Sequence, residues 1–203
     1  MSCRRCVFLI MSAKQKPDWP NQVQTLFAQL RAARKMARIA SEDASGSTGD
    51  VTIGLTLTSN LLASLALEMG LKSFYMYYFD SGPPKSHNLS ELFSDLHDLI
   101  RQDIDTNYRA NLSTDSTIAL IALRHSPNQP APPNDVPQQR FSTASELFDS
   151  VSNMFVRDRY FFENVVEADW AVIAHPIDQM DVMIEVLDNV FHHYKAKGGF
   201  GFG

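Results

Sequence analysis

The chain has 203 residues, of which 44% are hydrophobic and 20% are charged. This composition is typical of a folded single domain and excludes disorder of the whole chain. Eighteen Lys and Arg residues against 23 Asp and Glu residues give a net charge of −5. That charge excludes non-specific binding of polyanions by the whole surface, although a local basic face is still able to bind them.

The N-terminal region predicts a flexible leader over residues 1–18 rather than a signal peptide. The apolar run at residues 6–11 is shorter than the core of a signal peptide. Cys3 and Cys6 have no second pair of ligands downstream, so neither a disulfide scaffold nor a complete zinc site is indicated. No segment has about 20 consecutive apolar residues. We therefore expect a cytoplasmic protein without a membrane-spanning segment.

Two helices are predicted in the first half of the chain. Apolar residues recur with helical spacing over residues 23–37, after Pro20 and Asn21, which suit a helix start. This first helix is expected to end before the Ser/Gly-rich turn at residues 45–50. Residues 55–79 are apolar on most faces and predict a central buried helix. One glycine and two prolines at residues 81–85 end it.

The next segments predict a third helix and a short apolar element. Asn88 and Glu91 form a capping pair, which opens a helix whose apolar stripe extends from Leu89 to Ile104. Residues 118–123 form a short apolar run, which we expect to be helical because no nearby segment is available to pair with it as a strand. Five prolines fall within residues 126–137, so we expect an exposed loop over residues 126–138.

Two further helices complete the expected fold. Thr143 and Glu146 form another capping pair, opening a fourth long helix that continues past Phe162. The last helix begins near Pro176 and carries lysines at its end, where the helix dipole favours cations. Residues 198–203 predict a flexible glycine-rich tail. The sequence therefore predicts an all-α, antiparallel bundle of about five helices, forming one domain over residues 19–197.

Two charged pairs accompany the apolar faces of the second and fourth helices. Glu68 and Lys72 are four residues apart, as are Arg159 and Glu163 with the order of charges reversed. If the two helices pack together, these side chains form a buried or half-buried network. Such a network either fixes the register of the helices or forms a binding site.

At these residues the sequence resembles the HEPN superfamily (higher eukaryote and prokaryote nucleotide-binding domain). Residues 65–93 (LALEMGLKSFYMYYFDSGPPKSHNLSELF) contain an E-x-x-x-K core, a Gly/Pro break and a His-x-Leu-x-x-Leu helix start. Glu68, Lys72 and His87 are the polar members of this motif, with Leu89 and Leu92 as its leucines. The later RDRYFFE, residues 157–163, looks like the Arg-Tyr and following Glu of several non-RNase branches.

The resemblance implies a HEPN-like helical bundle, often dimeric, that cleaves RNA, acts in toxin-antitoxin or defence systems, or binds nucleotides. The RNase branch carries an arginine followed four to six residues later by a histidine near the last helix. Here Arg124 and His125 are adjacent, and Arg157 and Arg159 lead to aromatic residues. Metal-independent RNA cleavage of the usual type is therefore not expected.

We accordingly expect a non-catalytic binding module that recognises a nucleotide, RNA or protein partner as a homodimer, without a cofactor. The expected ligand-binding residues are Glu68, Lys72, His87, Arg159, Tyr160 and Glu163. The alternative is a ribonuclease or nucleotide-handling enzyme that uses the same cluster, with His87 as acid or base and Lys72 or Arg159 steadying a phosphate.

Two other groups of residues have a functional and a structural interpretation. A basic stripe on the first helix either contacts nucleic-acid phosphates or is a solvated face; it consists of Arg31, Arg34, Lys35 and Arg38. Asp188 and His192 are spaced as two metal ligands on the last helix. Two ligands do not make a site, so we expect no bound metal.

Overall fold

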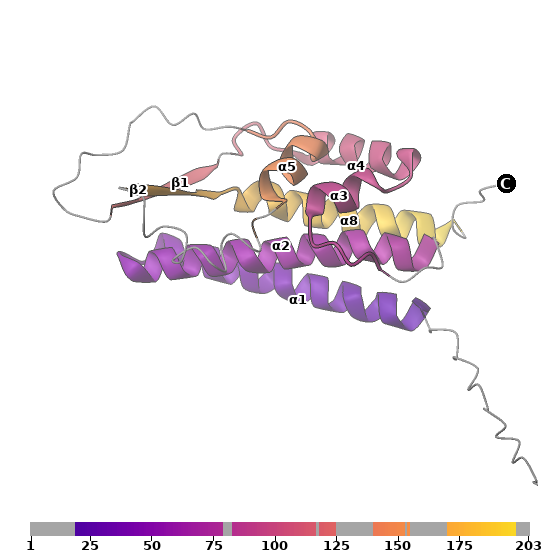
Figure 1. Ribbon diagram of the computed structural model, residues 1–203, viewed down its shortest axis with the longest axis horizontal. Coiled ribbons are helices and arrows are strands. Elements are labelled where there is room, and N and C mark those ends of the chain that lie inside the picture. The colour runs from indigo at the N-terminus through magenta and orange to yellow at the C-terminus, as the bar shows by residue number, and fades with distance from the viewer. Residues whose placement is uncertain are drawn as a thin grey trace, which may run out of the picture.

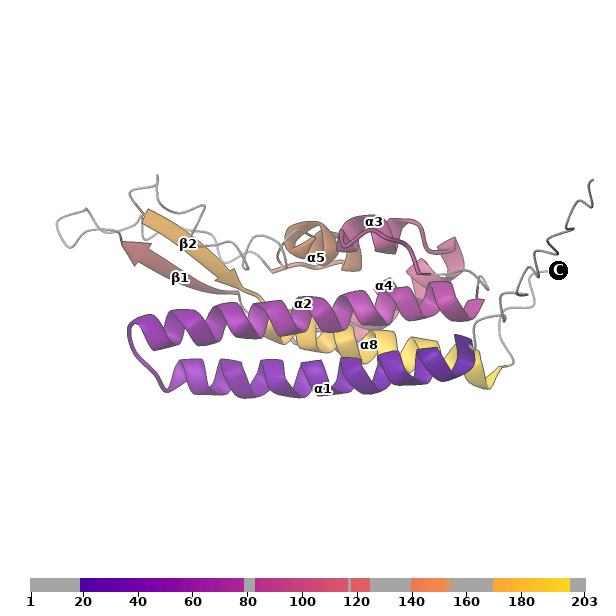
Figure 2. The same ribbon diagram turned by 60° about the horizontal axis from the view of Figure 1, so that its bottom comes forward.

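The computed structural model describes residues 19–78, 83–116, 118–124, 140–152, 154 and 170–197. Three long helices form its centre: α1 (Trp19–Ser45), α2 (Asp50–Tyr78) and α8 (Ile177–Ala196). Figures 1 and 2 show α1 and α2 side by side as a helical hairpin, with α8 packed along both. Gly49 takes a φ of 64° in the turn before α2, a conformation that glycine adopts without strain.

Three shorter helices cover the other side of α2 and α8. These are α3 (Leu89–Ser94), α4 (Asp98–Asn111) and α5 (Ala144–Val151), and Figure 1 shows them as a layer on the side away from α1. The core lies between the layers and contains fully buried side chains such as Phe74, Tyr108, Phe148 and Phe191. The predicted all-α bundle is therefore confirmed, with six helices in the described part of the chain.

The expected third helix is in fact two helices. The Asn88 side chain accepts a hydrogen bond from the Glu91 amide, as the capping pair predicts, but α3 ends at Ser94. His97 then caps α4 through a hydrogen bond from the Leu99 amide. The prediction of one helix up to Ile104 was wrong because the apolar stripe continues across the break, where side-chain caps compete with the helical hydrogen bonds.

The expectation of a helix at residues 118–123 was also wrong. Ala119–Arg124 form strand β1, which pairs antiparallel with β2 (Trp170–His175). This two-stranded ribbon extends from one end of the bundle (Figure 2). The partner strand lies about fifty residues downstream in the chain, and local spacing carries no signal for a pairing at that separation.

The two remaining helix predictions agree with the structure as far as it is described. The Thr143–Glu146 capping box is formed, with both reciprocal hydrogen bonds present at the start of α5. The predicted continuation past Phe162 lies outside the described residues. So do the predicted leader (1–18), loop (126–138) and tail (198–203). α8 begins directly after Pro176 and ends at Ala196, as predicted.

One described helix, α2, is long and apolar enough to cross a membrane by length and composition alone, with a mean hydropathy of 1.3 over 18 residues. The expectation of no membrane-spanning segment rested on the length of uninterrupted apolar runs, and it stays a prediction. In the fold, α2 packs against α1, α3 and α8 and buries Ser59, Asn60, Ser64 and Glu68 among its apolar residues. Because α2 is enclosed by other helices in this way, its apolar surface is that of a core helix.

Candidate functional site

Three of the predicted ligand-binding residues meet at the Glu68 carboxylate. Lys72, one turn further along α2, places Nζ 2.8 Å from Glu68 Oε1. His87, which precedes α3, places Nδ1 2.9 Å from the same oxygen. Glu68 is only 8% exposed, and a carboxylate removed from water to that extent requires charged or hydrogen-bonding partners. We call these three residues the Glu68 cluster.

The start of α3 fixes the position of His87 in this cluster. The Ser86 hydroxyl donates to Glu91 Oε2 at 2.6 Å and accepts from the Asn88 amide at 3.1 Å. The Asn88 side chain in turn accepts from the Glu91 amide. His87 thus lies between two residues whose side chains are held by the helix cap, so its backbone is restrained where the ring meets Glu68.

A groove between α1 and α2 passes directly beside the Glu68 cluster. We call it the α1/α2 groove; its volume is about 470 Å³, within the usual range for a small-molecule site. Its walls combine aliphatic and thioether side chains with the Glu68–Lys72 pair. The lining residues are Gln22, Thr25, Leu26, Leu65, Glu68, Met69, Lys72, Met76 and Pro83.

The other three predicted ligand residues, Arg159, Tyr160 and Glu163, lie outside the described residues. The four-charge network between the second and fourth helices therefore stays a prediction. Within the described part of the chain, the Glu68 carboxylate meets Lys72 of its own helix and His87 of the following segment.

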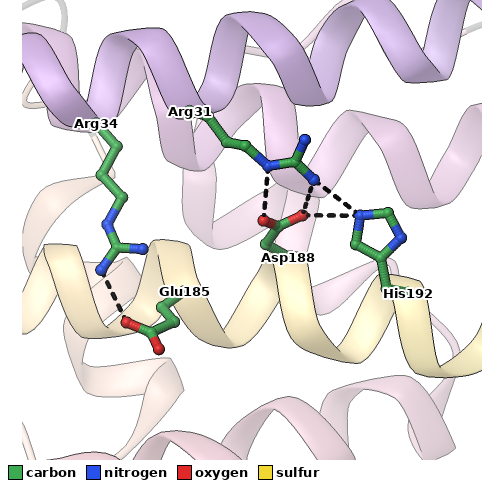
Figure 3. A network of polar contacts seen from close by, with 5 residues as sticks. All are labelled: Arg31, Arg34, Glu185, Asp188 and His192. Carbon is green, nitrogen blue, oxygen red and sulfur yellow. Dashed lines mark hydrogen bonds and ion pairs between the residues drawn. The ribbon is translucent and has the colours of Figure 1, made fainter.

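Arg31 and Arg34 of the basic stripe on α1 point toward acidic residues of α8, as Figure 3 shows. Arg31 donates two hydrogen bonds of 3.0 Å to Asp188. Arg34 donates to Asp181 at 2.6 and 2.8 Å and to Glu185 at 2.8 Å. The hydrogen bond to Asp188 raises the pKa of Arg31, and that to Asp181 raises the pKa of Arg34. Any phosphate bound by these arginines has to compete with the carboxylates of α8.

The other half of the stripe makes no such ion pairs with α8. Lys35 and Arg38 are exposed and form no ion pair with any residue that the structure describes. Nucleic-acid contact by the stripe stays a prediction, and Lys35 and Arg38 are its better-placed members. The signal for the pairing was present in the sequence, because Asp181, Glu185 and Asp188 follow helical spacing on α8 and mirror the stripe.

Sequence reasoning missed a polar cluster at the junction of α1, α2 and β2. His175, the last residue of β2, places Nδ1 2.7 Å from Asn60 Oδ1 and Nε2 3.0 Å from Ser41 Oγ. Asn60 and His175 are both buried. The three residues come from distant parts of the chain, and no spacing rule connects them. We call them the Ser41 cluster.

His175 makes the stability of the fold depend on pH. Burial lowers the pKa of His175, and the charge of Asp178 opposes part of this shift. Because the folded pKa lies below the unfolded value of about 6.5, protonation favours the unfolded chain. The contribution is complete above about pH 6.5 and is lost as the pH falls through the folded pKa.

We therefore expect thermal unfolding temperatures of the wild type to fall more steeply between pH 6.5 and pH 5 than those of His175→Gln, whose side chain does not titrate. Circular dichroism melts at matched ionic strength measure this difference. Parallel pH profiles for the two proteins would contradict the assignment.

No group of three or more His, Cys, Asp or Glu side chains in the described residues is arranged to hold a metal ion. The Asp188–His192 pair does form, with Asp188 Oδ1 3.1 Å from His192 Nε2, but Arg31 binds the same carboxylate. A cation in contact with both oxygens of Asp188 opposes a second positive charge there.

Comparison with family models, with curated proteins and with solved structures finds no match.

Proposed function

We propose that this chain is a HEPN-like helical module that binds a nucleotide, free or at the end of an RNA, without chemically changing it. The observation that carries the proposal is the position of the Glu68–Lys72 pair in the wall of the α1/α2 groove. Support also comes from the helical bundle and from the resemblance of residues 65–93 to the superfamily. A setting in toxin-antitoxin or defence systems is part of this proposal and rests on the resemblance alone.

The groove offers the two chemistries that a nucleotide requires. Leu26, Leu65 and Met69 supply apolar and polarisable surface for the face of a base. Lys72 supplies a cation at the same wall; its ammonium has three N–H donors, of which one points to Glu68 Oε1. A phosphate adjacent to the base is thus able to bind Lys72 while Glu68 continues to orient it.

The carboxylate of Glu68 restricts which ligands bind. A negative charge beside the lysine weakens the attraction for any lone anion, since the pair is neutral as a whole. Binding therefore depends on the base and the phosphate together. This argues for a nucleotide rather than inorganic phosphate, and for the end of an RNA rather than the backbone of a duplex.

Calorimetric titration with AMP, ADP and a five-nucleotide single-stranded RNA tests the proposal. Lys72→Ala is expected to weaken binding by about 10- to 100-fold, the value of a charge-assisted hydrogen bond. Lys197→Ala, at the exposed end of α8, is the control and should bind like the wild type. Absence of binding by all three ligands, or equal weakening by both variants, would contradict the proposal.

The same samples distinguish a binding module from an enzyme. Chromatography of the ligands after incubation should recover them intact. Cleavage or turnover that His87→Ala abolishes would replace the binding proposal with the enzymatic alternative.

The homodimer belongs to the same proposal. Met36 and Ile39 of α1 are 53% and 40% exposed, and large exposed apolar side chains gain from being covered. Sedimentation equilibrium should give twice the chain mass of 22.8 kDa. A single-chain mass at micromolar concentration would contradict the dimer without affecting the nucleotide site.

A cytoplasmic location is likewise proposed, and fractionation of cells that express the protein tests it.

A further inference from the structure

The Ser41 cluster has the order of groups found in nucleophile sites. The Ser41 hydroxyl on α1 is 3.0 Å from His175 Nε2, and His175 Nδ1 is 2.7 Å from Asn60 Oδ1 on α2. A hydroxyl, an imidazole and a group that orients the imidazole, each within hydrogen-bond reach of the next, are the arrangement that activates a serine.

The hydrogen-bonding groups of Asn60 and Ser41 determine which ring nitrogen of His175 carries the proton. The carbonyl oxygen of Asn60 only accepts, so His175 Nδ1 carries a proton and donates it. In the neutral imidazole, Nε2 then has a free electron pair and accepts from the Ser41 hydroxyl. Burial lowers the pKa of His175, which keeps the ring neutral at physiological pH. The imidazole is therefore in the tautomer that is able to remove a proton from Ser41.

Access to the cluster is limited to its serine. Asn60 is 0% exposed and His175 is 7% exposed, whereas Ser41 is half-buried and lines a hollow of about 340 Å³ at the surface between α1 and α8. A reagent that enters this hollow meets the hydroxyl while the base behind it stays shielded from water.

The charges around the hollow define what enters it. Arg34 is paired with Asp181 and Glu185. Arg38 precedes Ser41 by three residues, which places both on one helix face, and it forms no ion pair with a described residue. Glu42 and Asp178 also line the hollow. Because the carboxylates outnumber the arginines, the hollow favours a small, polar substrate without negative charge.

We propose that Ser41, His175 and Asn60 form a nucleophile site in which Ser41 accepts the acyl group of a small, uncharged carboxylic ester. Ser41 Oγ bonds to the ester carbonyl carbon while its proton passes to His175 Nε2. The bond from that carbon to the alcohol oxygen breaks, and the alcohol leaves with the proton from Nε2. Water then attacks the carbonyl carbon of the acyl-serine and passes a proton to His175 Nε2. The bond from that carbon to Ser41 Oγ breaks, Nε2 returns a proton to Oγ, and the acid is released. Arg38 is the nearest cation on the helix to oppose the negative charge of the carbonyl oxygen during each attack.

Labelling of the full chain with a fluorophosphonate, followed by peptide mass mapping, tests this proposal. The wild type should carry the adduct on Ser41, and Ser41→Ala should carry none. His175→Gln should react about 100-fold more slowly, the usual contribution of a general base. Ser45→Ala removes the next serine on the same face of α1, which does not contact His175, and should react like the wild type. An unlabelled Ser41, or equal rates in the wild type and His175→Gln, would overturn the proposal.

A second measurement leaves the buried histidine in place. The labelling rate of the wild type should fall as the pH drops through the folded pKa of His175, which burial places below the usual value of about 6.5, because protonated His175 no longer accepts the serine proton. The charge of Asp178 raises the pKa of His175, so Asp178→Asn should move this profile to lower pH. A rate that stays constant down to the pH at which the protein unfolds, or a profile unchanged in Asp178→Asn, would overturn the proposal. Hydrolysis of p-nitrophenyl acetate that Ser41→Ala abolishes would show the complete cycle, whereas a stable acetyl-serine would limit the proposal to its first step. The α1/α2 groove is lined by other residues, so neither result bears on nucleotide binding.

Discussion

Replacement of Phe191 by alanine is expected to lower the free energy of unfolding by about 4 kcal/mol, the usual cost of removing a fully buried aromatic side chain. Phe191 of α8 is 1% exposed and contacts aromatic rings of both other long helices. Its ring centroid is 4.3 Å from that of Phe27 on α1 and 5.5 Å from that of Phe74 on α2. The truncation therefore leaves a cavity where the three helices meet.

Urea unfolding followed by circular dichroism measures this loss. Leu99→Ala is a suitable control because Leu99 lies on α4 and is mostly exposed; its replacement should change the free energy by about 0.5 kcal/mol or less. A Phe191→Ala protein that loses no more than this control would contradict the packing of α8 against α1 and α2.

Gly70→Val is expected to destabilise the fold by about 3 kcal/mol through overpacking. A Cβ atom at Gly70 would lie 2.9 Å from Leu187 Cδ1 and 3.3 Å from Leu187 Cβ on α8, and 3.1 Å from Leu30 Cδ1 on α1. The first contact involves the end of a side chain, but the Leu187 Cβ is fixed to its helix and cannot rotate away. The branched side chain of valine therefore forces α8 and α2 apart.

Gly54 is the matched control on the same helix. A Cβ atom there meets nothing within 4 Å, so Gly54→Ala should raise the free energy of unfolding by about 1 kcal/mol through helix propensity. The two substitutions are thus expected to have opposite signs in the same urea titration. A stabilising or neutral Gly70→Val would show that α2 and α8 are not in close contact at this position.

The sequence predicted the parts of this fold that depend on local periodicity. The three long helices and the caps at Asn88 and Thr143 follow from spacing and from short-range hydrogen bonds, both of which can be read along the chain. The break between α3 and α4 was missed because the apolar stripe is the same on both sides of it. The β1–β2 ribbon was missed because a strand pair is stabilised by a partner that is distant in sequence.

The candidate site was predictable to a similar extent. Glu68 and Lys72 are one helical turn apart, so their pairing follows from spacing. The grouping of His87 with Glu68 was expected from the motif that the two residues share in residues 65–93. Ser41, Asn60 and His175 were not, because they meet only after two helices and a strand have packed. A buried histidine at the end of a strand has no local signature that separates it from an exposed one.

The pairing of Arg31 and Arg34 with α8 gives these two arginines a structural role, whereas the stripe was predicted either to contact phosphates or to be a solvated face. The stripe was predicted as one surface, yet α8 takes two of its members into bidentate hydrogen bonds with Asp188 and Asp181. Lys35 and Arg38 of the same stripe form no ion pair with the acidic side chains of α8. Local spacing identified the stripe, and tertiary packing decided which of its members are paired.

The most direct test of the proposed nucleotide site is the response of the methionine methyl groups to AMP, measured by NMR on protein labelled at the methionine methyl carbon. Met69 and Met76 line the α1/α2 groove, whereas Met180 and Met183 are buried in the core on α8. Saturating AMP is expected to shift the Met69 and Met76 signals and leave those of Met180 and Met183 in place. Unchanged Met69 and Met76 signals, with or without shifts elsewhere, would contradict a nucleotide site in this groove.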